Sequence, residues 1–504
     1  IGTTAGPVTL MENGATMTFS GYDGAHSGID SADTTEFNID TESRTGTDTK
    51  VVAQSYQYKG QTNAVTSIGT DVYGGISRVA NATRENNITV SSGSYTNAYG
   101  GYTDSVPPLP GSDAKANSAE KNNSHDNTIT IAGANVSGTV YGGYTNAAAG
   151  TATKNTVNVT SGTVANVVGG SSAAGAASDN TINLGAVTVT GNVTGGEGTA
   201  TNDNKVNVEG TTVAGSITAG STSGTGNKLT VKSANTAGSI AGFNKVIFDT
   251  DSATTNPMLT LNGGTSFLDW QTLEATGTSA GPITLMHNGA GLSFGGTYNG
   301  AHSRSDSDDT TEFNIDTENH TAADQRIVSE SYKYRLQNTP VEIGTDVFGG
   351  ISKVANSTRE NEITVSGSYT NAYGGHTDVP LTGTGTTKTD RDNSYKNTIT
   401  LSGGSVSGTV YGGYTTAATG KTWKNTVNVT GGSAANVVGA YSAGDATGNT
   451  VNVTGGNVTN VTGSITTGGK ASGNEITLGA VNIAGYVMGG QGATATNDNK
   501  VTLE

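Results

Sequence analysis

Cysteine is absent from this chain of 504 residues, and positively charged residues are scarce. The lack of cysteine excludes disulfide bonds and thiolate metal sites. With 25 Lys and Arg against 41 Asp and Glu, the net charge is −16, which disfavours binding to the phosphate backbone of nucleic acids. The sequence contains no run of 18 apolar residues, so it predicts no transmembrane helix, and no signal peptide is evident.

Large hydrophobic residues are also sparse. Only 33% of the chain is hydrophobic and 13% is charged, whereas 75 residues are glycine. A globular core in a chain of this length normally needs more apolar material, and a disordered chain would have fewer β-branched residues and no period. A β-solenoid needs only a thin core of small side chains. Thr and Val suit its strands, and Gly and Asn suit its corners.

The segment 127–144 contains a unit that much of the chain repeats. It reads NTITIAGANVSGTVYGGY, an alternating run followed by a Gly-containing turn and a second run. Related segments begin at Asn155, Asn180, Asn204 and Asn227, at steps of 28, 25, 24 and 23 residues. This pattern predicts an all-β fold, a parallel β-helix (β-solenoid) with coils of about 23–28 residues. We expect about 20 such coils, stacked at the usual strand spacing.

A longer period of 275 or 276 residues divides the chain into two tandem units. Three pairs of matching segments show it, beginning at Ala5 and Ala280, at Asp33 and Asp309, and at Ile68 and Ile343. We therefore expect a first unit at 1–276, with an irregular acidic start (5–67), a coil array (68–232) and wider apolar coils (233–276). The second unit, 277–504, is expected to carry one extra coil and to end within a coil, as part of a longer tandem array.

The alternation within each coil predicts which side chains are buried. In NTVNVT, Val157 and Val159 should point inward, which places Asn155 at a corner. If the corner residues stack, their amides can bond one another and the turn backbone, forming a ladder of Asn127, Asn155, Asn180, Asn204 and Asn227. The alternative is ordinary left-handed turn usage of asparagine without a ladder.

Glycine pairs recur from coil to coil, and those at 74–75, 100–101 and 142–143 are flanked by tyrosine, as in VYGGY at 140–144. No phosphate-binding loop is present, so we assign the pairs to corners that need positive φ or close stacking. The flanking tyrosines are Tyr73, Tyr99, Tyr141 and Tyr144. They are interpreted as half-buried ladder aromatics, with a strip that contacts sugar or protein as the alternative.

Residues suited to catalysis or metal binding are few. His26 and His302 recur in Gly-Ala-His-Ser beside acidic segments and are expected to be solvated. The acidic clusters comprise Asp30, Asp33, Glu36, Asp40 and Glu42, then Asp306, Asp308, Asp309, Glu312, Asp316 and Glu318. Such carboxylates can hold Ca²⁺ or act as an acid–base pair, but no calcium-loop motif is present and no spacing requires catalysis. We expect no catalytic residue, metal or cofactor.

The coil repeats, such as GNTVNVTGGNVTNVTG at 448–463 and VYGGYT at 140–145 and 410–415, resemble the passenger regions of type V autotransporters. These are haemagglutinin-like surface adhesins of diderm bacteria. The resemblance covers about two thirds of the chain. It implies a right-handed β-helix, secretion through a C-terminal outer-membrane barrel outside this chain, and display at the cell surface. It also implies adhesion to host or bacterial glycans or proteins, but it carries over no functional residue.

Two functions from different classes follow. The first is a surface adhesin or fibre, with a purely structural, self-associating filament as a close variant. The second is a secreted β-helical enzyme that acts on polysaccharides. Duplication favours the adhesin, because arrays add reach and avidity.

Binding is expected where the two units diverge, in the inserts at 104–126 and 378–396 and in the protrusion at 22–42 with its copy. The candidate binding residues are Asp104, Pro107, Pro108, Lys115, Asp378, Lys388, Arg391, Tyr22, His26 and His302.

Overall fold

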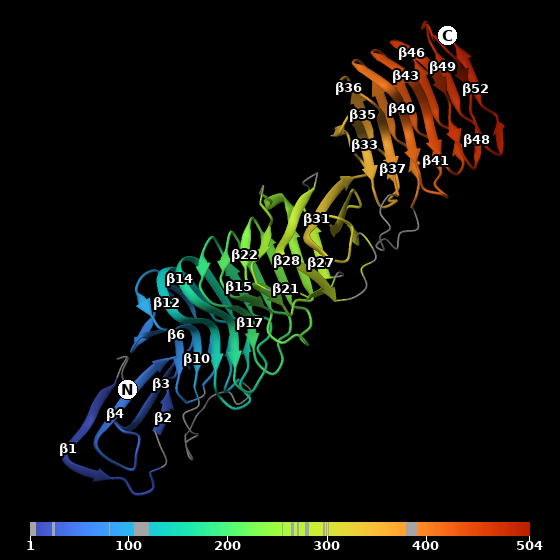
Figure 1. Ribbon diagram of the computed structural model, residues 1–504. Coiled ribbons are helices and arrows are strands. Elements are labelled where there is room, and N and C mark those ends of the chain that lie inside the picture. Colours follow the sequence, from blue (N-terminus) through green and yellow to red (C-terminus); the bar gives the residue numbers. More distant parts are fainter. Residues whose placement is uncertain are drawn as a thin grey trace. The chain divides into compact units, whose positions relative to one another are not determined.

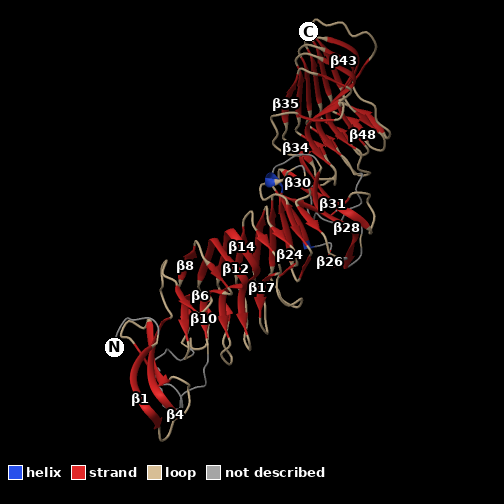
Figure 2. Cartoon of the chain, turned by 60° about the vertical axis from the view of Figure 1, so that its left-hand side comes forward, coloured by secondary structure: helices blue, strands red, loops and turns tan. Residues whose placement is uncertain are grey.

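The computed structural model describes residues 7–22, 26–79, 81–104, 120–254, 256–263, 267–269, 272–277, 282–295, 298, 300, 302–379 and 391–504. Strands account for 59% of the chain and form a β-solenoid of about 15 turns (Figures 1 and 2). Helical structure is limited to short 3₁₀ turns among the described residues, such as η1 (Thr250–Ser252). The predicted parallel β-solenoid is confirmed. The expected number of coils was too high, because the start of each repeat forms antiparallel strands instead.

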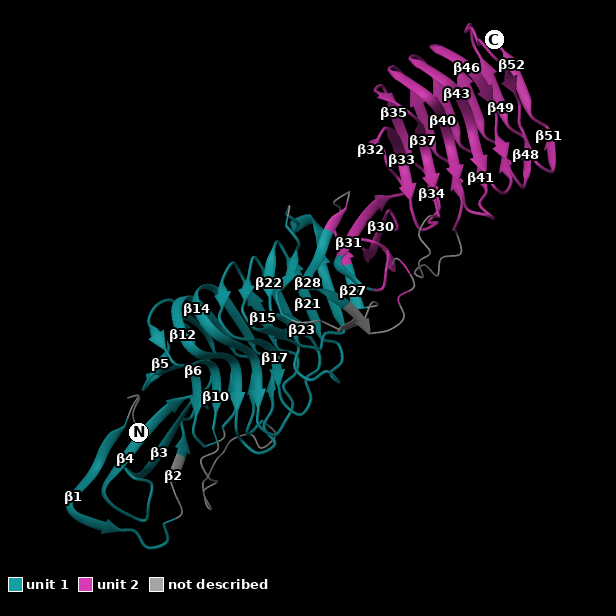
Figure 3. Cartoon of the chain, viewed as in Figure 1, with its two compact units in different colours: residues 1–274, 284–296, 323–326 teal, residues 275–283, 297–322, 327–504 magenta. Residues whose placement is uncertain are grey.

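The chain separates into two compact units (Figure 3). Unit 1 comprises residues 1–274, 284–296 and 323–326, and unit 2 comprises 275–283, 297–322 and 327–504.

Unit 1 opens with an antiparallel sheet that precedes the coils. Its strands are β1 (Val8–Thr18), β2 (His26–Ile29), β3 (Thr35–Thr41) and β4 (Thr47–Gln57), in the order β1-β4-β3-β2. In unit 2, β29 (His302–Ser305), β30 (Thr311–Thr317) and β31 (Asp324–Lys333) pair in the same antiparallel way. Sequence alternation identified strands here, but it carries no information on whether neighbours run parallel or antiparallel.

The coils of unit 1 stack their strands in parallel columns. The column after the corner asparagines contains β8 (Asn87–Val90), β12 (Thr128–Thr145), β14 (Thr156–Ser172), β15 (Thr181–Leu184), β18 (Lys205–Glu209), β21 (Lys228–Lys232) and β24 (Lys245–Asp249). The next column contains β9 (Ser94–Tyr95), β16 (Thr188–Val189), β19 (Thr212–Val213), β22 (Asn235–Ala237) and β25 (Leu259–Leu261), with parts of β12 and β14.

A third column carries the glycine pairs. Its strands are β6 (Asp71–Ser77), β10 (Ala98–Thr103), the ends of β12 and β14, β17 (Val193–Glu197), β20 (Ser216–Thr218) and β23 (Ser239–Ala241). The other described strands of this part of the chain are β5 (Thr66–Ile68), β7 (Thr83–Arg84), β11 (Ser124–His125), β13 (Ala152–Thr153), β26 (Phe267–Asp269), β27 (Leu273–Thr276) and β28 (Ile283–Gly295).

Unit 2 repeats these columns. The glycine-pair column contains β33 (Asp346–Ser352), β37 (Ala372–Thr377), β40 (Ser405–Thr415), β43 (Ser433–Ser442), β46 (Asn457–Thr462) and β50 (Val487–Met488), with β32 (Val341–Ile343), β36 (Ser368–Tyr369) and β47 (Ile465–Thr466) beside it. The column before the corner contains β34 (Thr358–Arg359), β38 (Ser394–Tyr395), β41 (Thr422–Trp423), β44 (Ala446–Thr447), β48 (Lys470–Ser472) and β51 (Ala495–Asn497). The column after it contains β35 (Glu362–Val365), β39 (Thr398–Leu401), β42 (Thr426–Val429), β45 (Thr450–Val453), β49 (Glu475–Leu478) and β52 (Lys500–Leu503).

The core is the thin aliphatic stack that the alternation predicts. Val157 and Val159 are fully buried and pair in register with Ile129 and Ile131 of the coil before. Thr156 precedes Val157, Asn158 lies between the two valines, and both are only half-buried. One side chain in two therefore faces the core along this strand.

The corner asparagines form a buried hydrogen-bonded ladder. The amide of Asn127 donates to Asn155 Oδ1 at 3.0 Å, Asn155 donates to Asn180 at 3.1 Å, and Asn180 donates to Asn204 at 3.2 Å. Asn227 Oδ1 accepts the main-chain N–H of Asn204 at 2.9 Å. In this series the left-handed backbone falls on the residue before each asparagine, Asp126, Lys154, Asp179, Asp203 and Gly226, with φ between 55° and 71°. The ladder and the left-handed turn therefore use adjacent residues.

The glycine pairs are required by close stacking. A Cβ at Gly142 would lie 2.3 Å from the carbonyl oxygen of Gly169 on the next coil. A Cβ at Gly143 would lie 2.4 Å from the amide nitrogen of Asn155. Both glycines therefore lie where adjacent coils leave no room for a side chain, next to the asparagine ladder.

Candidate functional site

Tyrosine rings stack in two rows on the outward side of the glycine-pair column in unit 1. We call Tyr73, Tyr99, Tyr102, Tyr141 and Tyr144 the aromatic face. The first row stacks Tyr73 on Tyr99 at 5.0 Å and Tyr99 on Tyr141 at 5.1 Å. The second row stacks Tyr102 on Tyr144 at 5.1 Å, and its rings meet the first row edge-on. These spacings follow the separation of adjacent strands.

The strand pattern explains both rows. On β10, Ala98 is fully buried and Tyr99 is on the opposite side, separated by the two glycines from Tyr102. Each tyrosine therefore faces its counterpart on the neighbouring coil, because the register pairs Tyr99 with Tyr141 and Tyr102 with Tyr144. The rows end after three coils, where Val168 and Ser171 take these positions.

Exposure changes along the aromatic face. Tyr73 and Tyr99 are 4% and 8% exposed, and Tyr56 of β4 packs against them. Tyr102, Tyr141 and Tyr144 are half-buried and keep part of their surface accessible to solvent. The antiparallel sheet thus covers the start of the rows and leaves the later rings accessible.

Unit 2 carries a related aromatic face with different residues. Phe348, Tyr373 and Tyr411 form the first row, with centroid distances of 5.0 and 5.2 Å. In the second row, His376 occupies the position of Tyr102 and meets Tyr414 edge-on at 4.7 Å. Tyr414 in turn stacks on Tyr441 of the next coil. Each unit therefore has its own aromatic surface, and the polar groups on these two surfaces differ.

An ion pair borders the aromatic face in unit 1. Arg78 donates to Asp104 at 2.9 Å, and its guanidinium lies 5.3 Å from the centre of the Tyr102 ring. Burial, together with the nearby carboxylates of Asp71 and Asp104 respectively, raises the pKa of Tyr73 and of Tyr102 to about 12. These hydroxyl groups remain protonated at neutral pH, and they donate hydrogen bonds to Asp71 at 3.4 Å and to Asp104 at 3.5 Å.

In unit 2 the same border is built from Lys353, Asp378 and His376. Lys353 donates to Asp378 at 3.1 Å, and Thr416 donates to the other carboxylate oxygen at 2.8 Å. Burial raises the pKa of Asp378, but these hydrogen bonds outweigh burial and hold it below its ordinary value. Burial lowers the pKa of His376 to about 4, although Asp378 opposes the shift. The imidazole is therefore neutral at physiological pH.

The predicted binding inserts begin at this border. Asp104 and Asp378 directly follow β10 and β37, so each insert leaves the solenoid beside the aromatic face of its own unit. Pro107, Pro108, Lys115 and Lys388 lie outside the described residues. Arg391 is half-buried where the second insert returns, and it pairs with Asn356 in an isolated antiparallel bridge. The two aspartates anchor the inserts, a role that their sequence positions did not reveal.

Several carboxylates of the acidic segments form hydrogen bonds and ion pairs within the protein. Tyr22 donates to Asp40 at 2.8 Å, and Asp33 accepts hydrogen bonds from Arg84 at 2.9 Å and Tyr58 at 2.5 Å. Arg359 makes the same contact with Asp309 in unit 2 at 2.6 Å. These carboxylates fasten the antiparallel strands to the first coil, which sequence inspection alone did not predict. The part of the chain that the structure describes contains no group of three or more His, Asp or Glu suited to a metal.

The histidines of the acidic segments lie within antiparallel pairs. His26 pairs with Ile39, and His302 pairs with Ile315. His302 is only 3% exposed, so the expectation that it is solvated and contributes to a binding surface is wrong. Its burial depends on the pairing of β29 with β30 in the folded unit, which is not visible in Gly-Ala-His-Ser.

Glu36 is a fully buried carboxylate that links the antiparallel sheet to the coils. Its oxygens accept hydrogen bonds from Ser77 Oγ, the Arg78 main-chain N–H, Asn38 and Asn81, at 2.7 to 3.0 Å. Glu312 in unit 2 has the same four kinds of partner. Burial raises the pKa of both carboxyl groups, and the hydrogen bonds lower it in part.

No described helix is long and apolar enough to cross a bilayer. Searches among protein-family models, curated proteins and solved structures found no significant match to this chain.

Proposed function

We propose that the chain is a non-catalytic binding rod displayed at a bacterial cell surface, an adhesin that contacts glycans or proteins of a host or of other bacteria. The observation that supports this proposal is the aromatic face, which recurs beside a divergent insert in each unit. Half-buried tyrosines supply apolar contact area together with hydroxyl groups, which is the composition favoured at protein and carbohydrate interfaces. Two such surfaces on one chain increase avidity.

The proposal assigns different roles to the two parts of each surface. The solenoid coils constrain the tyrosines through stacking, whereas the inserts at 105–119 and 380–390 differ in sequence between the units. We therefore assign affinity to the half-buried rings and selectivity to the inserts.

An adhesion assay with the full chain tests this function. Replacing 105–119 and 380–390 with short Gly-Ser linkers should abolish selectivity for particular cells, and adding Tyr144→Ser and Tyr414→Ser should remove the remaining binding. Far-ultraviolet circular dichroism of each variant controls for folding. Polysaccharide cleavage by the unmodified chain would instead support the enzyme, and unchanged binding by the combined variant would contradict the proposed surface.

A further inference from the structure

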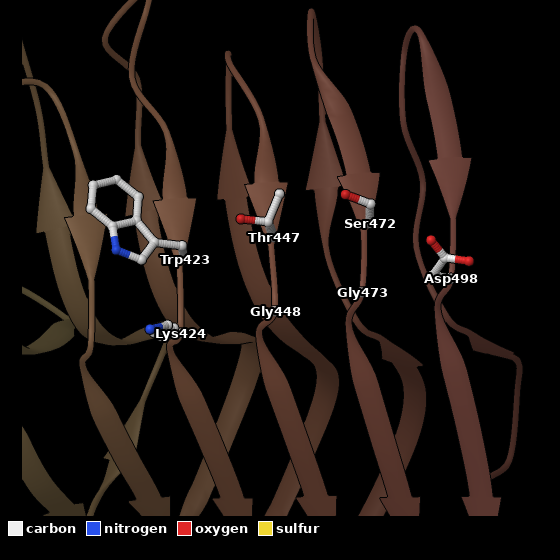
Figure 4. A pocket seen from close by; sticks show the side chains of 7 residues that line it. All are labelled: Trp423, Lys424, Thr447, Gly448, Ser472, Gly473 and Asp498. Atoms are coloured by element: carbon white, nitrogen blue, oxygen red, sulfur yellow. The ribbon is translucent and has the colours of Figure 1, made fainter.

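A second surface in unit 2 combines an indole with hydroxyl and charged groups in a shallow groove of about 380 Å³. The groove lies at the corner before the asparagine ladder, away from the glycine-pair column. Its lining residues are Trp423, Lys424, Thr447, Gly448, Ser472, Gly473 and Asp498 (Figure 4). We propose that this groove binds a short, neutral oligosaccharide. This inference goes beyond the proposed adhesive surface and does not depend on it.

The strand register places the side chains of the groove in a line. Trp423 pairs with Thr447, and Thr447 pairs with Ser472 on the next coil. Ser472 pairs with Asn497, the residue before Asp498. Figure 4 shows the four side chains on successive coils, with the indole at one end of the row. Four positions at the strand spacing span about 14 Å, which suits a short chain of sugars better than a single sugar.

Trp423 is held in place by an aromatic neighbour. Its ring stacks on Tyr395 with centroids 4.2 Å apart and planes inclined by 8°. Tyr395 covers one side of the indole, while the next position along the groove carries the smaller Thr447. Trp423 nevertheless remains half-buried rather than enclosed. A rigid, accessible aromatic surface of this kind matches the C–H-rich face of a pyranose ring.

The polar groups of the groove match the hydroxyl groups of a sugar. Thr447 and Ser472 can donate and accept hydrogen bonds, the Asp498 carboxylate accepts them, and the Lys424 ammonium donates them. Lys424 and Asp498 carry opposite charges, so the groove has no net charge to select a strongly ionic ligand. A neutral saccharide, which offers donors and acceptors along its whole length, is the ligand that this arrangement fits.

Two glycines keep the groove open. A Cβ added at Gly448 would meet no atom within 4 Å, and one at Gly473 would meet only the Gly448 nitrogen, at 4.0 Å. Both have left-handed backbone, with φ of 61° and 62°. Two corners of the ladder in unit 1, before Asn180 and Asn204, carry Asp179 and Asp203 in the same left-handed conformation, with φ of 60° and 55°. Side chains are thus tolerated at these corners in unit 1, and glycine in unit 2 leaves the space free.

Unit 1 also lacks the aromatic platform at the matching corner. Thr153 precedes Lys154 and the ladder residue Asn155, where unit 2 has Trp423 before Lys424 and Asn425. His125 stands where unit 2 has Tyr395. The groove is therefore a feature in which the two units differ, and unit 1 supplies substitutions that its own coils already accommodate.

The test uses the full chain with Trp270→Phe, so that Trp423 is the only tryptophan and its fluorescence reports on the groove. The probes are cellohexaose, chitohexaose, maltohexaose and mannohexaose. We expect at least one of them to change the fluorescence of Trp423 in a saturable way and to protect it from acrylamide quenching. Isothermal titration calorimetry measures the same binding without relying on the fluorophore.

The variants take their residues from unit 1. Trp423→Thr, and separately Gly448→Asp with Gly473→Asp, should weaken binding at least tenfold by calorimetry while leaving the circular dichroism spectrum unchanged. Asp179→Gly in unit 1 is the matched control and should bind as the parent does. The proposal is overturned if none of the four probes gives saturable binding, or if the best probe binds equally well to folded Trp423→Thr.

Discussion

The buried carboxylate of Glu36 accepts a 2.7 Å hydrogen bond from the hydroxyl of Ser77, 41 residues later in the chain. This contact joins the antiparallel sheet to the first glycine-pair strand of unit 1. All four partners of Glu36 donate hydrogen bonds to it. The site therefore suits a carboxylate, which only accepts hydrogen bonds.

Glu36→Gln should therefore loosen the start of the solenoid. The new amide replaces an accepting oxygen with a donor that faces other donors, and we expect a loss of about 2 kcal/mol in local stability. Hydrogen exchange of the amides in 71–79 measures it. Glu42→Gln is the control, because that side chain is 52% exposed and only meets Lys50 at 3.6 Å. Equal exchange rates in both variants would contradict a structural role for Glu36.

The stability of unit 2 should depend on pH through His376. Its pKa falls from 6.5 to about 4 on folding, because burial disfavours the charged imidazole. The unfolded chain then binds more protons between these values, so the stabilisation is present above pH 6.5 and is lost as the pH falls toward 4. The loss is at most about 3 kcal/mol.

Comparison of His376 with His376→Tyr isolates this effect from the other titrating groups. Tyrosine is the residue of unit 1 at this position, Tyr102, and it does not titrate in this range. Urea unfolding at pH 7 and pH 4.5 should show a smaller loss for the variant. The same loss in both proteins would assign the pH dependence to other groups.

The asparagine ladder should contribute more to stability than the half-buried row of polar side chains that contains Asn158. Asn155 is fully buried and bonds Asn127, Asn180 and the carbonyl of Ser124, so Asn155→Ala leaves several buried groups without partners. We expect a loss of about 3 kcal/mol or more. Asn158→Ala removes hydrogen bonds from a half-buried row and should cost about 1 kcal/mol. Equilibrium unfolding of the two variants compares them directly.

Val157→Asp tests the assignment of the core. The side chain is fully buried, so the substitution places an unpaired charge among aliphatic neighbours and should cost about 4 kcal/mol. Thr156→Asp, one residue earlier and half-buried, should cost less than about 1 kcal/mol. Thermal melts of both variants decide whether the inward and outward faces are assigned correctly.

Local periodicity was enough to predict the coils. The recurring asparagine, the alternation around Val157 and the glycine pairs each repeat at the coil length, so a parallel stack follows from sequence alone. The antiparallel strands at the start of each unit have no such period. Their direction depends on pairings such as Glu36 with Tyr56, which only the folded chain reveals.

Functional surfaces were less predictable from the sequence, because they also depend on contacts between segments that are distant in the chain. The tyrosine rows were visible as candidates because they share the coil period. The burial of His302 and the anchoring roles of Asp104 and Asp378 depend on contacts between distant segments. The Trp423 groove was missed because it depends on the absence of side chains at Gly448 and Gly473 on two later coils.

The asparagine ladder has a direction. From Asn127 to Asn204, the side-chain amide of the earlier residue donates to the oxygen of the later one. A coil inserted within this run brings one donating amide and one accepting oxygen, and it restores the bond that it interrupts. Gain or loss of a whole coil therefore leaves no unpaired amide in the ladder, which makes the length of the array evolutionarily adjustable while its cross-section stays fixed.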